Sequence, residues 1–225
     1  MTPRILPPGL IVSCQAEGDS PFNAPVFIAA FARAAEMGGA VAVRVCGAEN
    51  VAAVRRAVHI PVIGLTKSAY PDGSVLITPG QEDVAALIGA GADVVAMDGT
   101  ARRRATGWSG TDTLGGVVRA FAAPVMADVA TLEEGLAAAA AGAAYVGTTL
   151  SGYTPDTQAR DDGEPDFGLL EGLAARLPGR VIMEGRIWTP AQAAEALRRG
   201  AHAVVVGTAI TRPVEIVRRF AAALS

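Results

Sequence analysis

Lys67 is the one lysine of the chain, and it directly follows an apolar run at residues 61–66. The chain has 19 lysine and arginine residues in total, so arginine supplies every other positively charged side chain. Arginine keeps its charge at any ordinary pH, whereas a lysine in a crowded apolar site can lose its proton and act as a base. Lys67 is therefore a candidate for proton transfer, and the alternative is a solvated loop lysine.

Polar residues end several other short apolar runs in the same way. Arg44, Asp98, Asp128 and Glu184 each close a run in which alternate positions are apolar. Alternate residues of a strand share one face, so such a charge points into the space that its apolar column faces. Other runs end in Gln15, Thr148-Thr149 and Gly207. Together these residues predict one polar site that could hold a substrate and transfer a proton.

Structural roles compete with this reading. Arg44 and Asp128 could pair with each other, and even then they would lie where a polar substrate binds. Glu184 could form an ion pair with Arg186 or Arg212 instead of taking part in catalysis, and we favour catalysis.

The segments that must position these residues alternate regularly between two types. Apolar, β-branched runs at residues 9–15, 40–45, 61–67, 93–98, 124–129, 144–150, 180–185 and 203–207 are the predicted strands. Alanine-rich segments at residues 22–37, 48–57, 81–89, 114–122, 131–141, 167–176, 190–199 and 213–224 are the predicted helices. Eight strands alternating with eight helices predict an α/β protein with a (β/α)8 TIM barrel. The alternative, a doubly wound open sheet, more often carries a GxGxxG turn, which this sequence lacks.

In TIM barrels the loops after strands seven and eight commonly bind phosphate. Gly185 and Arg186 follow the seventh predicted strand, and Gly207, Thr208 and Arg212 follow the eighth. Backbone N–H groups and a guanidinium are suitable donors for a phosphate group. We therefore predict that these residues bind phosphate.

Asp98 and two polar loop segments complete the polar features of the sequence. Asp98 could orient Lys67 or Arg44, or it could cap a turn. The arginines at 102–104 are expected to form a solvated loop. Residues 151–165 are rich in Gly, Asp, Thr and Pro and are predicted to form an active-site loop.

The composition excludes several classes of function. With 225 residues, 51% of them hydrophobic, the chain can bury one large core, and we expect a single domain over residues 1–225. A net charge of −3 argues against nucleic-acid binding and against a surface for anionic membranes.

Cys14 and Cys46 have no disulfide or metal spacing, and no leader-like segment is evident, so we expect a cytoplasmic protein. His59 and His202 have no ligand spacing either, and we predict neither a metal nor an organic cofactor.

Several motifs together resemble one enzyme family, N-acetylmannosamine-6-phosphate 2-epimerase, from about residue 9 to the C-terminus. They are Ser13-Cys14-Gln15-Ala16, Val43-Arg44, Gly64-Leu65-Thr66-Lys67, Met126-Ala127-Asp128, the block Gly147-Thr148-Thr149-Leu150-Ser151-Gly152-Tyr153-Thr154, Glu184-Gly185-Arg186 and Ala209-Ile210-Thr211-Arg212-Pro213. The resemblance implies a cofactor-independent isomerase that interconverts N-acetylmannosamine 6-phosphate and N-acetylglucosamine 6-phosphate in sialic acid catabolism. It also suggests a homodimer.

The resemblance implies a role for each site residue. Lys67 would move the C2 proton, and Glu184 would be its acidic partner. The sugar and its acetamido group would be held by Gln15, Arg44, Asp128, Thr149 and Tyr153. The phosphate would be held by Gly185, Arg186, Gly207, Thr208 and Arg212. The chain departs from the family at Thr208 and in the loop at 102–107.

Other functions remain open from the sequence. A class I aldolase on the same barrel would use the strand-end lysine as a Schiff-base nucleophile. A different sugar-phosphate isomerase, or a non-catalytic sugar-phosphate sensor, would use a similar pocket.

Overall fold

The computed structural model describes residues 5–16, 18–158 and 163–224. Within these ranges eight parallel strands close into a barrel in the order β1-β10-β9-β8-β7-β6-β3-β2. Their bounds are β1 (Gly9–Cys14), β2 (Ala42–Cys46), β3 (Val62–Leu65), β6 (Val94–Asp98), β7 (Val125–Asp128), β8 (Tyr145–Gly147), β9 (Val181–Glu184) and β10 (Ala203–Val206). The predicted TIM barrel is confirmed.

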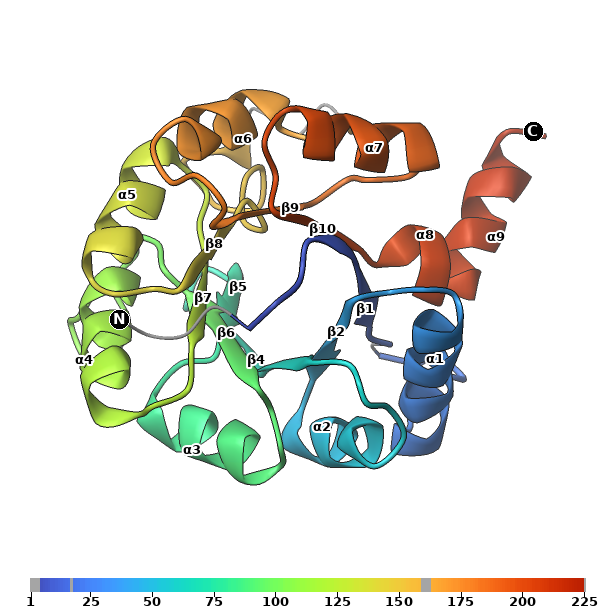
Figure 1. Ribbon diagram of the computed structural model, residues 1–225, viewed down its shortest axis with the longest axis horizontal. Helices are drawn as coiled ribbons and strands as arrows, with labels where there is room; N and C mark the ends of the chain where they lie inside the picture. Colours follow the sequence, from blue (N-terminus) through green and yellow to red (C-terminus); the bar gives the residue numbers. More distant parts are fainter. Residues whose placement is uncertain (1–4, 17, 159–162, 225) are drawn as a thin grey trace.

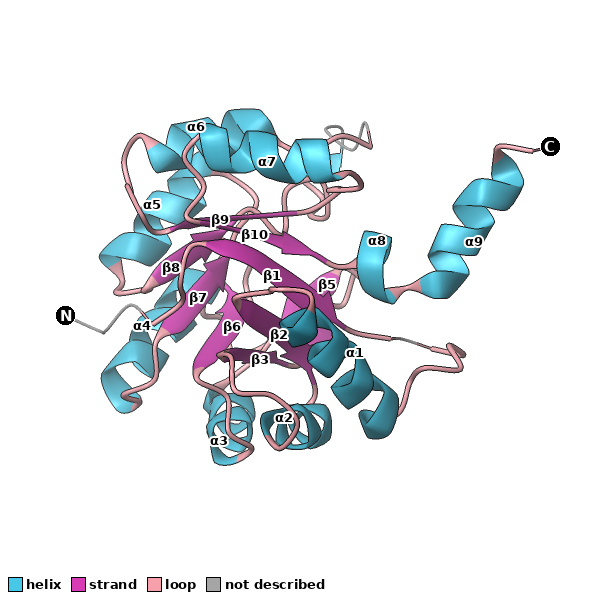
Figure 2. Ribbon diagram, turned by 45° about the vertical axis from the view of Figure 1, so that its right-hand side comes forward, coloured by secondary structure: helices cyan, strands magenta, loops and turns pink. Residues whose placement is uncertain are grey.

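Helices surround the barrel on its outer side (Figure 1). The helix bounds are α1 (Pro25–Met37), α2 (Ala48–Arg55), α3 (Gln81–Gly89), α4 (Gly110–Ala120), α5 (Leu132–Ala140), α6 (Phe167–Ala174), α7 (Pro190–Arg198), α8 (Thr208–Thr211) and α9 (Pro213–Ala222). The last helix, α9, extends away from the barrel in both ribbon views (Figures 1 and 2).

The strands alternate between two buried environments, which is why they read as continuous apolar runs. Ile11 and Ile63 belong to a cluster inside the barrel. Val12 and Val43 belong to a larger cluster between the strands and the helices. Because the inner column of each strand is apolar in its first part, the polar side chains gather toward the carboxyl ends, around the mouth of the barrel.

Capping residues fix where several helices begin. Thr131 caps α5 and Thr189 caps α7, and both form reciprocal capping boxes, as their sequences predict. The prediction for α4 was wrong at its start, because this helix begins at Gly110 and not at residue 114. Ser109 and Asp112 form a further capping box there, which satisfies the first backbone N–H groups and nucleates the helix earlier.

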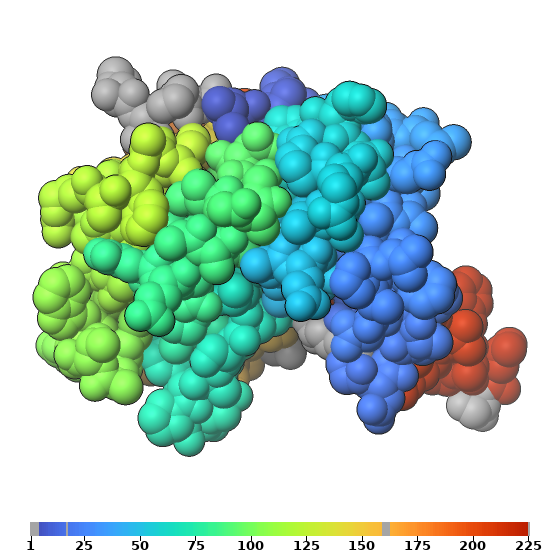
Figure 3. Space-filling model, turned by 90° about the horizontal axis from the view of Figure 1, so that it is seen from below, coloured from blue at the N-terminus to red at the C-terminus, as the bar shows by residue number. Residues whose placement is uncertain are grey.

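A β-hairpin was missed by the sequence prediction. The predicted strand at 61–67 ends at Leu65, and Lys67 instead begins β4 (Lys67–Ala69), which pairs in antiparallel fashion with β5 (Val75–Ile77). This hairpin is a separate two-stranded sheet outside the barrel order. In the space-filling view the turquoise residues of this part of the chain project from the body of the molecule (Figure 3).

Candidate active site

A cavity of about 520 Å³ opens at the carboxyl ends of the barrel strands, a size typical of small-molecule sites. Most of the residues predicted from the sequence line it together, although they come from distant parts of the chain. They are Gln15, Arg44, Lys67, Thr149, Tyr153, Glu184, Gly185, Arg186, Gly207, Thr208 and Arg212. Asp128 is fully buried and lies behind this wall, where it contacts Arg44.

Arg44 is the buried centre of the site. Its two terminal nitrogens donate to the carboxylate of Asp128 at 3.0 and 2.7 Å, and one of them lies 3.1 Å from the carboxylate of Glu184. Burial by itself lowers the pKa of Arg44, but the charges of Asp128 and Glu184 more than offset this and raise it above its ordinary value. Arg44 is therefore a permanent positive charge at the mouth of the barrel. The sequence left open whether Arg44 pairs with Asp128, and the structure shows that it does.

Glu184 is the carboxyl group that a ligand can reach. Its side chain is 15% exposed, whereas that of Asp128 is fully buried. Burial raises the pKa of Glu184, Arg44 lowers it, Asp128 raises it and the hydrogen bond from Thr149 lowers it, and the net result lies above the ordinary value. A carboxyl group with a raised pKa takes up and releases protons closer to neutral pH, which suits general acid–base catalysis. Glu184 pairs with Arg44, and neither Arg186 nor Arg212 is among its described salt-bridge partners.

Two adjacent threonines hold Glu184 from different sides. The hydroxyl of Thr148 donates to the backbone carbonyl of Glu184 at 2.8 Å and lies 3.0 Å from its backbone nitrogen. The hydroxyl of Thr149 lies 3.1 Å from the Glu184 carboxylate and 2.6 Å from that of Asp128. Because Thr148 and Thr149 directly follow β8 and Glu184 ends the neighbouring strand β9, the barrel sheet sets the position of the carboxyl group.

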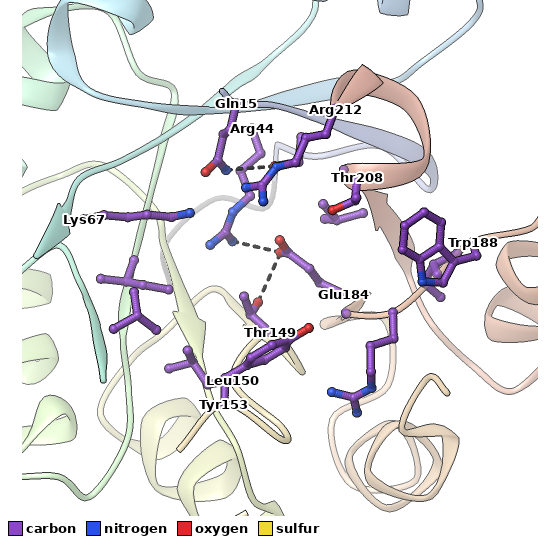
Figure 4. A pocket seen from close by; sticks show the side chains of 18 of the residues that line it. Gln15, Arg44, Lys67, Thr149, Leu150, Tyr153, Glu184, Trp188, Thr208 and Arg212 are labelled. Atoms are coloured by element: carbon purple, nitrogen blue, oxygen red, sulfur yellow. Dashed lines mark hydrogen bonds and ion pairs between the residues drawn. The ribbon is translucent and has the colours of Figure 1, made fainter. Parts of the chain in front are cut away.

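Lys67 faces Glu184 from the opposite wall of the cavity. Its ammonium end points toward Arg44 and Glu184 in the close-up (Figure 4). The Lys67 charge also contributes to lowering the pKa of Glu184, which requires the two groups to be near each other. The lysine therefore points into the site, although it stands on the hairpin and not on a barrel strand.

Gln15 leaves an acceptor unused. Its side-chain nitrogen donates to the hydroxyl of Ser13 at 2.8 Å. Among the described residues, its Oε1 atom is one of the buried polar atoms without a hydrogen-bond partner. Because burying a polar atom without a partner costs free energy, a donor on a ligand is the natural partner for it.

The loops after β9 and β10 form another wall of the cavity. Gly185 has φ +114°, a backbone conformation that only glycine adopts without strain, and a Cβ there would meet no atom within 4 Å. Gly207, Thr208 and Arg212 lie along the same wall. The backbone at Gly185 can thus approach a ligand closely.

Arg186 lines the cavity and also contacts the neighbouring loop. Its guanidinium donates to the backbone carbonyls of Ser151 at 2.7 Å and Glu164 at 2.6 Å. It also lies 5.6 Å from the ring centre of Tyr153. In the structure Arg186 therefore ties the loop that carries Tyr153, a predicted active-site loop whose residues 159–162 are outside the described part of the chain.

Several residues of the cavity wall were not among the site residues predicted from the sequence. Val75 and Ile77 come from the hairpin, whose short strands are interrupted by Tyr70-Pro71-Asp72-Gly73 and gave no strand signal. Trp188 also lines the cavity, and Arg219 of α9 stacks on its ring at 4.2 Å. Ser13 could have been found, because it precedes Gln15 by two residues and thus shares its face of β1.

Within the described ranges no three His, Cys, Asp or Glu side chains are grouped so that they could hold a metal ion. None of the described helices has the length and apolar character of a membrane span.

Comparison with known sequences identifies related proteins over nearly the whole chain. The model of the family described as "Putative N-acetylmannosamine-6-phosphate epimerase" matches residues 28–225. A Caldanaerobacter subterraneus protein named "Putative N-acetylmannosamine-6-phosphate 2-epimerase" is 47% identical over 213 residues, which cover 94% of this chain and 89% of that protein. A Cutibacterium acnes protein of the same name is 48% identical over 218 residues, with coverages of 96% and 93%.

Solved structures agree with the sequence comparison. The N-acetylmannosamine-6-phosphate 2-epimerase from Clostridium perfringens matches with a TM-score of 0.88 and 39% identity, over 96% of this chain and 93% of that chain. Thiamine phosphate pyrophosphorylase from Pyrococcus furiosus matches with a TM-score of 0.61 at 16% identity, which shows a shared fold alone. From its barrel, its cavity and these relatives, the chain belongs to the N-acetylmannosamine-6-phosphate epimerase family.

Proposed function

We propose that this protein interconverts N-acetylmannosamine 6-phosphate and N-acetylglucosamine 6-phosphate by moving the proton on C2, with side chains alone as catalysts. The observation that carries the proposal is the position of Lys67 and Glu184, which face each other across the cavity with Arg44 between them (Figure 4). Inversion at C2 needs a base for the C2 proton and a partner for the charge that develops on O1. These three side chains supply both.

The first step opens the sugar ring. The carboxylate of Glu184 accepts the proton of the O1 hydroxyl, the C1–O5 bond breaks, and O5 takes a proton from the Lys67 ammonium, which gives the open-chain aldehyde and a neutral Lys67 amine. Glu184 suits this step because its pKa is raised, which makes the carboxylate a better base than an exposed one. Its exposed edge faces the cavity, where O1 can reach it.

The second step moves the C2 proton. The amine of Lys67 accepts the proton on C2, and the electron pair left behind forms the C1=C2 bond of an enolate, with the negative charge on O1. The protonated Glu184 returns its proton to O1, and the positive charge of Arg44 stabilises the developing anion. Rotation of the enol about its C2–C3 bond turns the opposite face of C2 toward Lys67, which returns a proton to C2 while Glu184 takes the proton back from O1. Ring closure by the reverse of the first step then gives the epimer.

Substrate binding is assigned to the remaining residues of the cavity. The partnerless Oε1 atom of Gln15 is a suitable acceptor for the acetamido N–H. Tyr153 and Thr149 line the wall near Glu184. For the phosphate we propose Gly185, Gly207, Thr208 and Arg212, with the backbone N–H groups and the guanidinium as donors. Arg186 and Asp128 act one step away, by holding the Tyr153 loop and Arg44.

The test is incubation with N-acetylmannosamine 6-phosphate in deuterated water, followed by proton NMR. We expect the parent protein to form the epimer with deuterium at C2, and Lys67→Met to lose about 100-fold or more of the activity. Lys67→Arg is the matched control, because it keeps the charge but cannot lose its proton, so we expect it to be equally inactive.

Other outcomes would point to the alternative functions. Tight binding without any turnover by the parent would favour a sugar-phosphate sensor. A covalent adduct on Lys67, trapped by borohydride in the presence of the sugar phosphate, would favour a Schiff-base aldolase. Either result would contradict the epimerase.

The proposal includes one domain over residues 1–225, a cytoplasmic location and a homodimer. The location is supported by the two cysteines of the chain, Cys14 and Cys46, which are not joined by a disulfide, as expected in a reducing compartment. The dimer is supported by α9, which extends from the barrel at the rim of the molecule (Figures 2 and 3) and exposes Val217 and Phe220 by 65% and 71%. Large exposed apolar side chains on a helix that projects from the barrel favour burial against a second copy. Sedimentation equilibrium of the parent and of Phe220→Glu tests this, and a parent that sediments as a monomer would contradict it.

A further inference from the structure

The hairpin that carries Lys67 follows barrel strand β3 directly but is not part of the barrel sheet. Strands β4 and β5 pair only with each other in the described structure. Lys67 is the first residue of β4, and Ile77 of β5 is its partner in the register. Val75 and Ile77 also line the cavity. Whatever fixes the hairpin relative to β9 therefore fixes Lys67 relative to Glu184.

Arg102 connects the tip of the hairpin to the barrel. Its guanidinium donates to the Ser74 hydroxyl at 3.0 Å and to the Val75 carbonyl at 3.1 Å, and it stacks on the Tyr70 ring at 4.3 Å. The same guanidinium donates to the carboxylate of Asp98 at 2.7 Å. One side chain thus holds three points of the hairpin against the end of β6.

Asp98 is the fixed point of this network. It is fully buried at the end of β6, and its Oδ1 atom accepts hydrogen bonds from the backbone and the hydroxyl of Thr100 at 2.9 and 2.6 Å. Its Oδ2 atom accepts the Tyr70 hydroxyl at 3.3 Å. Burial and the nearby Asp98 raise the pKa of Tyr70, so the phenol keeps its proton and remains a donor.

The base of the hairpin is held separately. The Thr78 hydroxyl donates to the Ala96 carbonyl at 2.6 Å, and the Thr78 backbone N–H donates to the Thr66 carbonyl at 3.0 Å. Arg104 donates to the carbonyls of Asp98, at 3.0 Å, and of Pro79. These contacts hold one end of the two-stranded sheet and the Arg102 network holds the other, so the two together set the position of β4.

The expectation of a solvated arginine loop at 102–104 was wrong for two of its three members. The Arg102 side chain is 11% exposed and Arg104 is 6% exposed. Arg103 is exposed, and its guanidinium donates to Gly107 within its own loop. The exposure of the three arginine side chains alternates because they lie in a short extended segment. In such a segment residues 102 and 104 share one face, and residue 103 points the other way.

We propose that Asp98, Arg102 and Tyr70 are positioning residues that hold the Lys67 hairpin at the distance from Glu184 that C2 proton transfer requires. The inference rests on the proposed epimerase function. A misplacement of about 1 Å between reacting groups can cost roughly 100-fold in rate, so a hairpin free to tilt would lower kcat. The network lies on the hairpin side of the cavity, away from the residues assigned to phosphate, so KM should change little.

The experiment compares Arg102→Met with Arg103→Met, a matched control from the adjacent position. For Arg102→Met we expect kcat to fall about 10- to 100-fold while KM stays within about threefold of the parent. For Arg103→Met we expect both constants to stay near those of the parent. Arg102→Lys keeps a charge beside Asp98 but loses the fork that reaches both Ser74 and Val75, so it should restore kcat only in part.

A second comparison separates positioning from a general effect on folding. In a Lys67→Met background, Arg102→Met should lower the residual activity no further, because no lysine is left to position. A purely structural role would lower the activity by the same factor in both backgrounds. If Arg102→Met does not fold, as judged by circular dichroism, Arg102→Lys carries the test in its place.

Two results would overturn the inference. One is an active parent with both Arg102 variants matching Arg103→Met in kcat. The other is a loss that appears entirely in KM. A parent without epimerase activity is a different outcome, because it contradicts the proposed function itself.

Discussion

The Asp128 carboxylate accepts hydrogen bonds from both terminal nitrogens of Arg44, at 3.0 and 2.7 Å, and so joins β7 to β2, strands that are not neighbours in the barrel. Both side chains are at most 2% exposed. The same guanidinium lies 3.1 Å from the Glu184 carboxylate, so the Arg44–Asp128 pair also holds Glu184 in position.

The first prediction concerns the stability of this pair. Arg44→Met leaves the buried charge of Asp128 without a partner and should lower the free energy of unfolding by about 3–5 kcal/mol. Arg55→Met is the control, because its pair with Asp93 is partly exposed and such pairs contribute only about 0.2–1 kcal/mol. Urea denaturation measures both, and equal losses would contradict the prediction.

The second prediction concerns Glu184 and pH. Because its folded pKa lies above the ordinary 4.5, the folded chain holds a proton that the unfolded chain has already released. The parent should therefore lose stability as pH rises from about 4.5 through the raised pKa of Glu184, and Glu184→Gln should not. The variant should gain stability over the parent toward higher pH and be inactive.

Glu195→Gln provides a control of opposite sign for this measurement. Hydrogen bonds from Arg198 and Arg199 lower the pKa of Glu195, so its contribution to stability is lost as pH falls and not as it rises. The measurement is the melting temperature of the parent, Glu184→Gln and Glu195→Gln as a function of pH. A Glu184→Gln advantage that shrinks with rising pH would show that the pKa is not raised.

The third prediction uses the hydroxyl of Thr149. In the proposed mechanism Glu184 must be ionised to begin catalysis, so kcat/KM rises with pH through the pKa of Glu184. The Thr149 hydrogen bond lowers that pKa, so Thr149→Val should move the acidic limb to higher pH. Thr113→Val is the control. It removes a hydroxyl of α4 that donates to the backbone carbonyl of Ser109, and it should leave the pH dependence of kcat/KM unchanged. A limb that moves to lower pH would contradict the assignment.

The fourth prediction tests the phosphate site. Arg212→Met should raise KM for the phosphorylated sugar about 10- to 100-fold, the loss expected for a hydrogen bond to a charged group, and change kcat less. Arg218→Met, on exposed α9, is the control and should behave as the parent does. Steady-state kinetics with the unphosphorylated sugar complete the test, because Arg212→Met should not lower kcat/KM for that sugar.

The sequence alone determined the barrel and most of the cavity wall. Both follow from local chemistry, since alternating strand and helix patterns set the fold and polar residues at the strand ends define its mouth. Gln15, Arg44, Thr149 and Glu184 line the cavity for that reason.

Only the tertiary structure decided which of these groups meet. Arg44 and Asp128 are 84 residues apart, and their pairing depends on closure of the barrel and not on any local pattern. Lys67 reaches the site from a hairpin whose strands are three residues each, too short to give a periodic signal. Arg102 is buried because its side chain contacts Asp98 and the tip of the hairpin, whereas the adjacent Arg103 is exposed to solvent. Sequence patterns report the surroundings of a residue along the chain, but pairing, burial and pKa depend on segments that only folding brings together.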